Sequence, residues 1–180
     1  MGLLLSAAEL WLPEIIQRRQ LGKLFSLTAR TFGCPAPRLV GLSRRTLLHE
    51  FASFTRDRTL RCLPAEAPAV RERLYSGAYD MGADLRRVFA IRAAEEVMQA
   101  ARVAYRVLHI DLTGSVEGQI IIRRCFFSPY YPNSVCQFIS ALDEGLLAGL
   151  SDGWWLRFQQ RITDGSECCR AWLGSPEVKQ

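Results

Sequence analysis

Several features that commonly reveal a function are scarce or missing in this sequence. Two histidines and two lysines occur in 180 residues, and the six cysteines include no CxxC pair. Because a zinc ribbon needs paired cysteines at that spacing, the cysteine pattern disfavours such a site. No residue is assigned as a metal ligand, and the sequence leaves open whether a metal is present. The residues also indicate no particular cofactor.

Long hydrophobic runs are missing as well. The most apolar stretch, MGLLLSAAELWLPEII, is interrupted by Glu9, Pro13 and Glu14. It is too short and too charged to span a bilayer, and it lacks the basic start of a secretory signal. Because six irregularly spaced cysteines occur without an export signal, we expect free thiols in a reducing compartment, which predicts a cytoplasmic protein.

Positive charge is carried almost wholly by arginine, with 21 arginines and a net charge of +5. Residues 1–90 hold 14 basic and 8 acidic side chains (+6), whereas residues 91–180 hold 9 and 10 (−1). No run of like charge exceeds two residues, and no basic stripe is interleaved with aromatic residues. Nucleic-acid binding favours such stripes. We therefore expect a small-molecule ligand or substrate and no nucleic acid, while the pattern leaves the oligomeric state open.

The first two-thirds of the chain has helical periodicity. Apolar residues recur every three or four positions in segments that begin near Pro13, Leu47, Pro68 and Met98. Proline-containing breaks such as FGCPAP separate these segments. The pattern predicts a helical half over residues 1–110.

From about residue 113 the period changes to two. EGQIIIRRCFF, WWLRFQQRIT and ECCRAWL are typical of three strands, and a helix is expected over about 134–149, between the first two. No repeat or low-complexity linker divides the chain. We therefore predict one α+β domain over residues 1–180, in which the helical half packs on a small antiparallel sheet with one inserted helix (113–173).

The last predicted hairpin places two adjacent cysteines near an arginine. With Asp164–Gly165 as a two-residue turn, Arg161 lies opposite Cys168, and Cys169 faces the core. The same register sets two further pairs: Gln159–Arg170 and Arg157–Trp172. A guanidinium beside a thiol lowers its pKa, which makes Cys168 a candidate nucleophile or ligand. A three-residue turn would shift the pairing by one residue and exchange the roles of the two cysteines.

The predicted helix over 134–149 supplies a carboxylate. Asp143 lies beside the apolar stripe of this helix, where it could act as a general base or orient a substrate amine. Glu144 points about 100° away and is expected in solvent. Cys136 lies seven residues before Asp143, too far to share a metal ion easily, and is expected to be a small core residue.

Further candidates lie where the first predicted strand ends. Cys125 closes that strand, and the loop after it contains Tyr130 and Tyr131, which could wall a pocket or cover the sheet edge. The complete set of candidates comprises four possible catalytic residues and three substrate-binding residues: Cys125, Cys168, Cys169 and Asp143, with Arg161, Tyr130 and Tyr131. A purely structural role is an equally good explanation for any one of them.

Three features occur together in the C-terminal third: Cys125 at a strand end, ALDEGLLAGL in the next helix, and LRFQQRITDGSECCRAWL at the last hairpin. Over roughly residues 115–173 they resemble the L-2-amino-thiazoline-4-carboxylic acid hydrolase-like family. The resemblance implies a hydrolase that opens a C–N bond in a small cyclic amino-acid derivative. It also implies that the terminal cysteine is Cys169, four residues after Gly165, whereas the hairpin register favours Cys168.

The same ending is similar to four-vinyl-reductase-type ligand-binding domains, although Arg161 stands where those domains have a further cysteine. Two hypotheses follow. In the first, a thiolate, Arg161 and Asp143 share the pocket of a small-molecule hydrolase. In the alternative, a non-catalytic domain binds an apolar or anionic small molecule between the helices and the sheet, and this class of ligand includes metals and tetrapyrroles.

Overall fold

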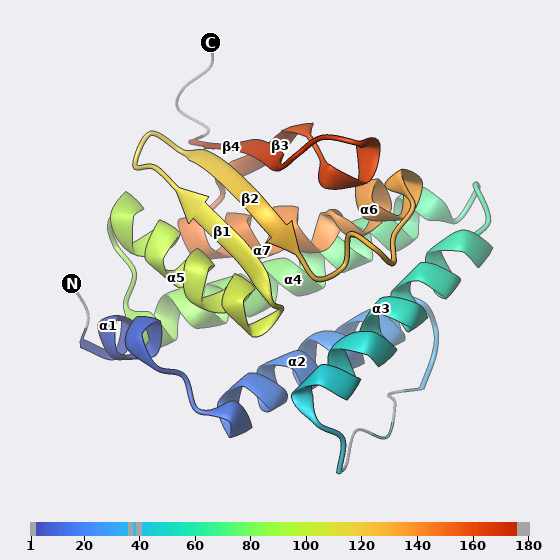
Figure 1. Cartoon of the computed structure of the whole chain (residues 1–180), viewed down its shortest axis with the longest axis horizontal. Helices are drawn as coiled ribbons and strands as arrows, with labels where there is room; N and C mark the ends of the chain where they lie inside the picture. The colour runs from blue at the N-terminus through green and yellow to red at the C-terminus, as the bar shows by residue number, and fades with distance from the viewer. Residues whose placement is uncertain (1–2, 36–37, 39–40, 176–180) are drawn as a thin grey trace.

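The computed structural model describes residues 3–35, 38 and 41–175, and the predicted change from helices to strands is visible along the chain (Figure 1). The described helices before the sheet are α1 (Leu3–Leu10), α2 (Glu14–Thr31), α3 (Arg44–Arg61), α4 (Ala67–Phe89) and α5 (Ala94–Val107). The remaining elements are β1 (Ile110–Gly114), β2 (Gln119–Cys125), α6 (Asn133–Ile139), α7 (Ala141–Ser151), β3 (Trp155–Gln160), the 3-10 helix η1 (Ile162–Asp164) and β4 (Cys169–Gly174). The fold is of the α+β class, as predicted.

Local signals in the sequence account for where the helices begin and end. Before α3, the Ser43 hydroxyl accepts a hydrogen bond from the Thr46 backbone N–H at 3.1 Å. Pro68 lies in the first turn of α4, where its missing N–H is not needed. The same helix ends at Ala90, which adopts the left-handed conformation with φ of 52°. These boundaries follow from residues adjacent to them in the chain.

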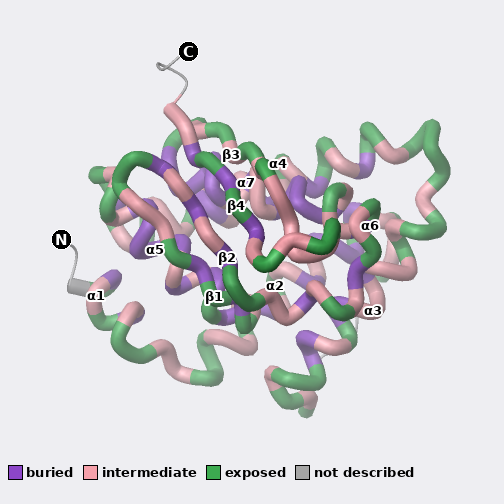
Figure 2. The backbone as a smooth tube through the Cα atoms, turned by 45° about the horizontal axis from the view of Figure 1, so that its top comes forward, coloured by how far each residue is buried: buried purple, intermediate pink, exposed green. Residues whose placement is uncertain are grey.

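The sheet is antiparallel, with the order β1-β2-β4-β3 among the described strands. It contains one strand, β1, that the sequence did not predict. This strand is only five residues long, so its pattern in the sequence is weak. Ile110 and Leu112 are buried and Asp111 is exposed, so the alternation exists but is too brief to stand out beside α5. His109, with φ of 54°, makes the bend between α5 and β1. Along β4, buried and exposed residues alternate (Figure 2).

The inserted helical segment is two helices and not the single one predicted. The chain bends at Ser140, which ends α6 and precedes α7. Its hydroxyl donates to the Gln137 carbonyl oxygen at 2.7 Å. A serine hydroxyl that bonds to a nearby carbonyl competes with the regular helical pattern and accounts for this bend.

The last hairpin differs from the predicted two-residue turn. The chain makes η1 and then Gly165, which has φ of 92°, before β4 begins. The predicted pair Arg157–Trp172 is present, but an irregularity after Phe158 places Gln160 opposite Arg170 in place of Gln159. Cys169 is buried, as the original register required, and Cys168 is half-buried.

Close contact between α4 and α7 depends on glycine. A Cβ on Gly82 would lie 2.2 Å from the Leu146 carbonyl oxygen, and one on Gly145 or Gly149 would lie 2.1 Å from a carbonyl oxygen of α4. No side chain fits at such distances. The two helix backbones therefore touch, and this contact places α7 between α4 and the sheet (Figure 1).

We predict that Gly82→Ala lowers the free energy of unfolding by about 2 kcal/mol or more, because the new methyl group would meet immovable backbone. Gly77→Ala is the matched control on the same helix. A Cβ there would meet only the Leu27 side chain, at 2.8 Å, which can move. We expect its effect to stay within about 1 kcal/mol, since alanine also favours helix. Urea unfolding followed by circular dichroism measures both, and equal losses would contradict the contact described above.

Candidate functional site

A cavity of about 180 Å³ lies between the helices and the sheet. Its wall is formed by residues of α2 to α7 and of the inner face of the sheet, and most of its side chains are aliphatic or aromatic. The polar or titratable side chains on the wall are Gln20, Tyr105, Cys125, Tyr131, Cys136, Ser140, Asp143 and Cys169. Asp143 is the single charged side chain among the described residues that line it. The cavity is therefore apolar over most of its surface and polar where α5, α7 and β4 meet.

The centre of the polar end is a hydrogen bond between two buried groups. The Tyr105 hydroxyl, on α5, donates to Oδ1 of Asp143, on α7, at 2.6 Å. Burial raises the pKa of the Asp143 carboxyl from 3.8 to about 6, although the bond from Tyr105 and the charge of Arg161 act in the opposite direction. Burial and the neighbouring carboxylate place the pKa of Tyr105 well above its ordinary value. At neutral pH the pair is thus a carboxylate bonded to a neutral phenol.

Three thiols share this end of the cavity: Cys125 from β2, Cys136 from α6 and Cys169 from β4. Burial raises the pKa of all three, to about 12 for Cys125. Arg161 lowers the pKa of Cys136 and Cys169, as expected for a guanidinium near a thiol, but burial has the larger effect. The thiols are therefore protonated at neutral pH, which makes them weak nucleophiles.

The structure separates the two adjacent cysteines. Cys169 lies on the cavity wall, where its sulfur accepts from the Ile162 backbone N–H at 3.4 Å. Cys168 is not part of that wall, and its sulfur lies 3.6 Å from Nε2 of Gln160. The cysteine that reaches the cavity is thus the one indicated by the family resemblance, not the one that the two-residue turn placed on the polar face.

Arg161 lies against the polar end of the cavity without being part of the lining. Its guanidinium stacks over the Phe158 ring, 4.3 Å from the ring centre, and Nη2 donates to the Ser140 hydroxyl at 3.4 Å. Nε is buried and has no hydrogen-bond partner. No ion pair joins Arg161 to any residue that the structure describes. A half-buried arginine with a buried, unused donor is suited to bind an acceptor from a ligand.

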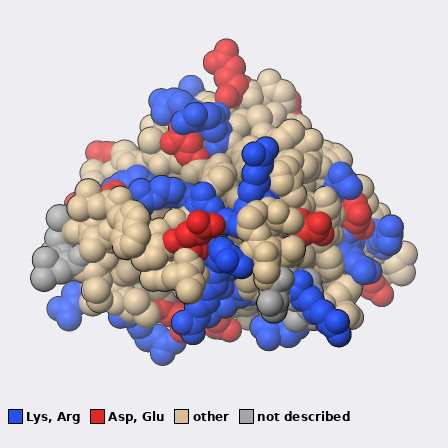
Figure 3. Space-filling model, turned by 60° about the horizontal axis from the view of Figure 1, so that its bottom comes forward, with Lys and Arg blue, Asp and Glu red and all other residues tan. Residues whose placement is uncertain are grey.

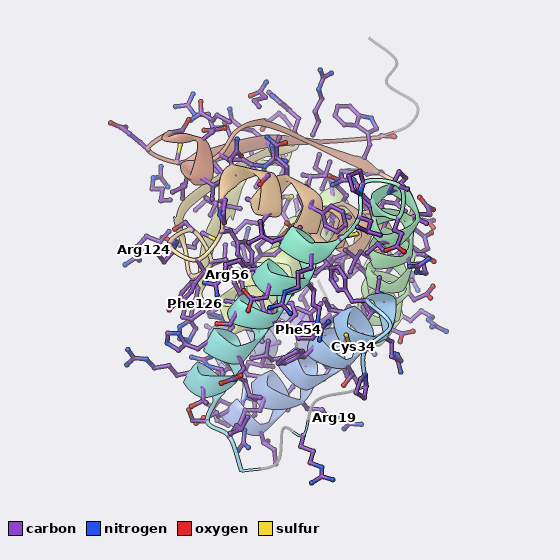
Figure 4. The ribbon with its side chains drawn as sticks, turned by 90° about the vertical axis from the view of Figure 1, so that its right-hand side faces the viewer. Arg19, Cys34, Phe54, Arg56, Arg124 and Phe126 are labelled. Carbon is purple, nitrogen blue, oxygen red and sulfur yellow. The ribbon has the colours of Figure 1, made fainter. Side chains whose placement is uncertain are left out.

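The two candidate tyrosines lie in different places. Tyr131 lines the cavity, where its hydroxyl is hydrogen-bonded to Thr55 of α3 and burial raises its pKa. Tyr130 points the other way, and its hydroxyl bonds to Nδ1 of His49 at 2.6 Å. Phe126 packs beside it against His49, at the end of β2 next to α3 (Figure 4). Tyr130 is therefore not brought to the site.

Two features of this region were missed or misjudged from the sequence. Tyr105 was not among the candidate residues, although it recurs at helical spacing after Met98 and Ala101. The available signal was that a buried tyrosine hydroxyl needs a hydrogen-bond partner. Glu144 was expected in solvent, and this prediction is wrong. Its two carboxylate oxygens accept hydrogen bonds from Arg71 of α4, at 2.6 and 2.7 Å. The packing of α4 on α7 brings that arginine within reach.

Comparisons with known proteins leave the family resemblance untested, since no family model and no curated protein matches the chain. Within the described residues, no three histidine, cysteine, aspartate or glutamate side chains are grouped so that they could hold a metal ion. No described helix combines the length and the apolar character that crossing a bilayer requires.

We predict that Asp143 makes stability depend on pH between about 4 and 6. Because its pKa is raised on folding, the native state holds the proton more tightly than the unfolded chain. The contribution of Asp143 to the free energy of unfolding therefore falls as the pH rises from about 4 to 6, and it is constant above pH 6. Asp143→Asn should remove about 2–3 kcal/mol of this pH dependence, as measured by urea unfolding at several pH values.

The control for this measurement is Asp152→Asn, because Asp152 is an exposed residue at the end of α7. It should change stability little at any of these pH values. If wild type and Asp143→Asn lose stability in parallel from pH 4 to 6, the carboxyl is not buried as described.

Proposed function

We propose that this protein binds a small, mainly apolar molecule in the cavity, and that the ligand has a basic nitrogen held by Asp143 and a carboxylate held by Arg161. The observation that carries the proposal is the presence of one carboxylate on an otherwise uncharged wall. An ionised acid in such surroundings is stabilised by a positively charged partner. None of the described lining residues provides one.

The apolar part of the ligand follows from the size and lining of the cavity. A volume of about 180 Å³ is comparable to cavities that take up a single aromatic ring and is below that of typical drug-sized pockets. Aliphatic side chains such as Val103, Leu142 and Leu146 surround this space. They favour a compact hydrocarbon or ring over an extended polar substrate.

The head of the ligand follows from the unused hydrogen-bonding capacity. Oδ1 of Asp143 accepts from Tyr105, which leaves Oδ2 for an ammonium or amidine group. The unpartnered Nε of Arg161 can donate to a carboxylate. Both groups occur together in amino-acid derivatives, so a compact, apolar amino-acid derivative is the ligand class that fits best.

Benzylamine, benzoate and toluene test the two ends of the site separately. We predict that the wild-type protein binds benzylamine and that Asp143→Asn weakens this binding by about tenfold or more, because a charge-assisted hydrogen bond is lost. Arg161→Met should weaken benzoate binding in the same way. Toluene binding should change little in either variant. Isothermal titration calorimetry measures each affinity.

Glu144→Gln is the matched control, since Glu144 neighbours Asp143 in sequence but binds Arg71 outside the cavity. It should leave benzylamine affinity unchanged. The proposal fails if the wild type binds none of the three probes, or if Glu144→Gln weakens benzylamine binding as much as Asp143→Asn.

A hydrolase acting on a C–N bond is the second candidate, favoured by the pKa of Asp143. A carboxyl with a pKa of about 6 is suited to take a proton from water near neutral pH. Cys169, the cysteine that the family resemblance implies, lines the same cavity. Against this candidate, a cysteine nucleophile requires a thiolate, and burial raises the pKa of each thiol on the cavity wall.

Alkylation by iodoacetamide separates the two candidates. At pH 7 we expect Cys125 and Cys169 to react more slowly than Cys34, a half-buried cysteine after α2 that does not line the cavity, because only thiolates react readily. Mass spectrometry of digested protein measures the rates. Faster reaction of Cys169 than of a cysteine in the unfolded chain would reverse the order of the two candidates.

A further inference from the structure

The corner where α1 meets α2 exposes an unusual amount of apolar surface. Leu10, Trp11 and Ile15 are 86%, 72% and 77% exposed, and Ile16 is 40% exposed. Leu4 is also exposed. The Trp11 N–H donates to the Ala7 carbonyl oxygen, so the helical hydrogen bonding of α1 continues to Trp11. Leu4 lies seven residues before Trp11 and therefore on the same side of this helix. These five residues are the apolar corner. A contiguous apolar patch of this kind indicates an interaction site.

The cavity extends to the same corner. Leu12, Ile16, Gln20 and Leu24 follow one another at four-residue spacing, and all four line the cavity. Because Ile16 is also exposed, this side chain connects the cavity wall with the outer surface. The apolar corner therefore adjoins the proposed ligand site at Ile16.

Unpaired cations flank the apolar corner. Ile15, Arg18, Arg19 and Lys23 share one side of α2 and line a shallow open groove beside it. Arg18, Arg19 and Lys23 form no ion pair with any described residue. Figure 3, which views the molecule from below, shows Lys and Arg side chains spread over this face next to uncharged surface. Arg19 lies on the side of α2 that faces away from the sheet (Figure 4).

Three carboxylates belong to the same region. Glu9 precedes Leu10 in the chain and is already paired with Arg102. Glu14 begins α2 between Trp11 and Ile15, and Asp84 lies at the edge of the groove. Asp84 is already paired with Arg87. The three unpaired cations therefore exceed the acidic charge near the apolar corner, and the excess attracts an anionic partner.

We propose that the apolar corner docks on the surface of an anionic lipid bilayer, with Trp11 and Ile15 inserted at the interface and Arg18, Arg19 and Lys23 against the headgroups. Tryptophan and aliphatic side chains enter the bilayer interface, and lysine and arginine beside them attract anionic headgroups. The apolar corner and its neighbouring cations combine both. A protein partner matched to the same surface would need acidic and apolar groups in one fixed arrangement, whereas a bilayer offers both in any orientation.

Docking in this orientation places Ile16, where the cavity wall reaches the outer surface, against the lipid. An apolar ligand could then move between bilayer and cavity without crossing water. This last step rests on the proposed function, but the docking itself does not. Vesicle binding is measured without a ligand and ligand binding without vesicles, so failure of one leaves the other intact.

Sedimentation with lipid vesicles tests the docking. We expect the full chain to bind phosphatidylcholine vesicles that contain about 30% phosphatidylserine, and to bind pure phosphatidylcholine at least about tenfold more weakly. Trp11→Ser with Ile15→Ser, and separately Arg18→Gln with Arg19→Gln, should each weaken binding by about tenfold or more. Added salt should weaken binding of the wild type.

Matched pairs elsewhere on the surface serve as controls. Leu60→Ser with Leu63→Ser removes two side chains of similar exposure, 59% and 60%, and Arg123→Gln with Arg124→Gln removes an exposed arginine pair on β2. Both should leave vesicle binding unchanged. All of the altered positions are on the surface, so thermal unfolding should show each variant folded.

Two results would overturn the proposal. The first is vesicle binding that is absent or is equally reduced by the control pairs. The second is self-association of the wild type in sedimentation velocity that Trp11→Ser with Ile15→Ser abolishes, which would assign the apolar corner to contact with a second copy of this chain.

Discussion

Contact between the backbones of α4 and α7 determines the position of Asp143 at the polar end of the cavity. Three glycines permit this contact, because no Cβ fits between the helices. With α7 held in that position, Asp143 faces Tyr105 and the cavity, while Glu144, one residue on, faces Arg71 on α4. Two neighbouring carboxylates thus have opposite environments. One is paired with a cation, and the other is bonded only to a phenol.

This difference has a chemical consequence. The carboxylate bound to arginine is satisfied within the protein, and its role is structural. Asp143 has a pKa raised by burial and no cation bonded to it, so its ionised form is costly in the folded protein unless a ligand compensates. The same burial keeps the nearby thiols protonated. The site is thus better prepared to hold a charged group than to attack one, which is why binding ranks above hydrolysis here.

The proposed ligand site and the apolar corner are connected by α2. One side of this helix lines the cavity, and an adjoining side carries the exposed apolar and basic residues. Because successive residues of a helix point about 100° apart, a single helix can serve both surfaces. An apolar ligand and an interfacial docking surface are consistent with each other, since both favour a molecule that partitions into lipid.

The sequence was sufficient to predict the class of fold, most helices and three of the four described strands. It also predicted the burial of Cys169. Periodicity, proline and capping residues act over a few neighbouring positions and are therefore readable along the chain. The break at Ser140, the short strand β1 and η1 in place of a tight turn were not predicted, because each depends on a few residues whose signal is weak. Of the candidate residues, Cys125, Tyr131, Asp143 and Cys169 line the cavity, whereas Tyr130 and Cys168 do not. Tyr105 was not among the candidates, because its bond to Asp143 depends on the packing of α5 on α7.

By itself, the sequence determined which segments are helices and strands and which faces of them are apolar, since those properties depend on spacing along the chain. Only the tertiary structure decided that Tyr105 meets Asp143, that Arg71 takes Glu144, and that Cys169, not Cys168, reaches the cavity. These contacts join residues far apart in the chain or depend on how a turn closes, and no local pattern encodes such distances.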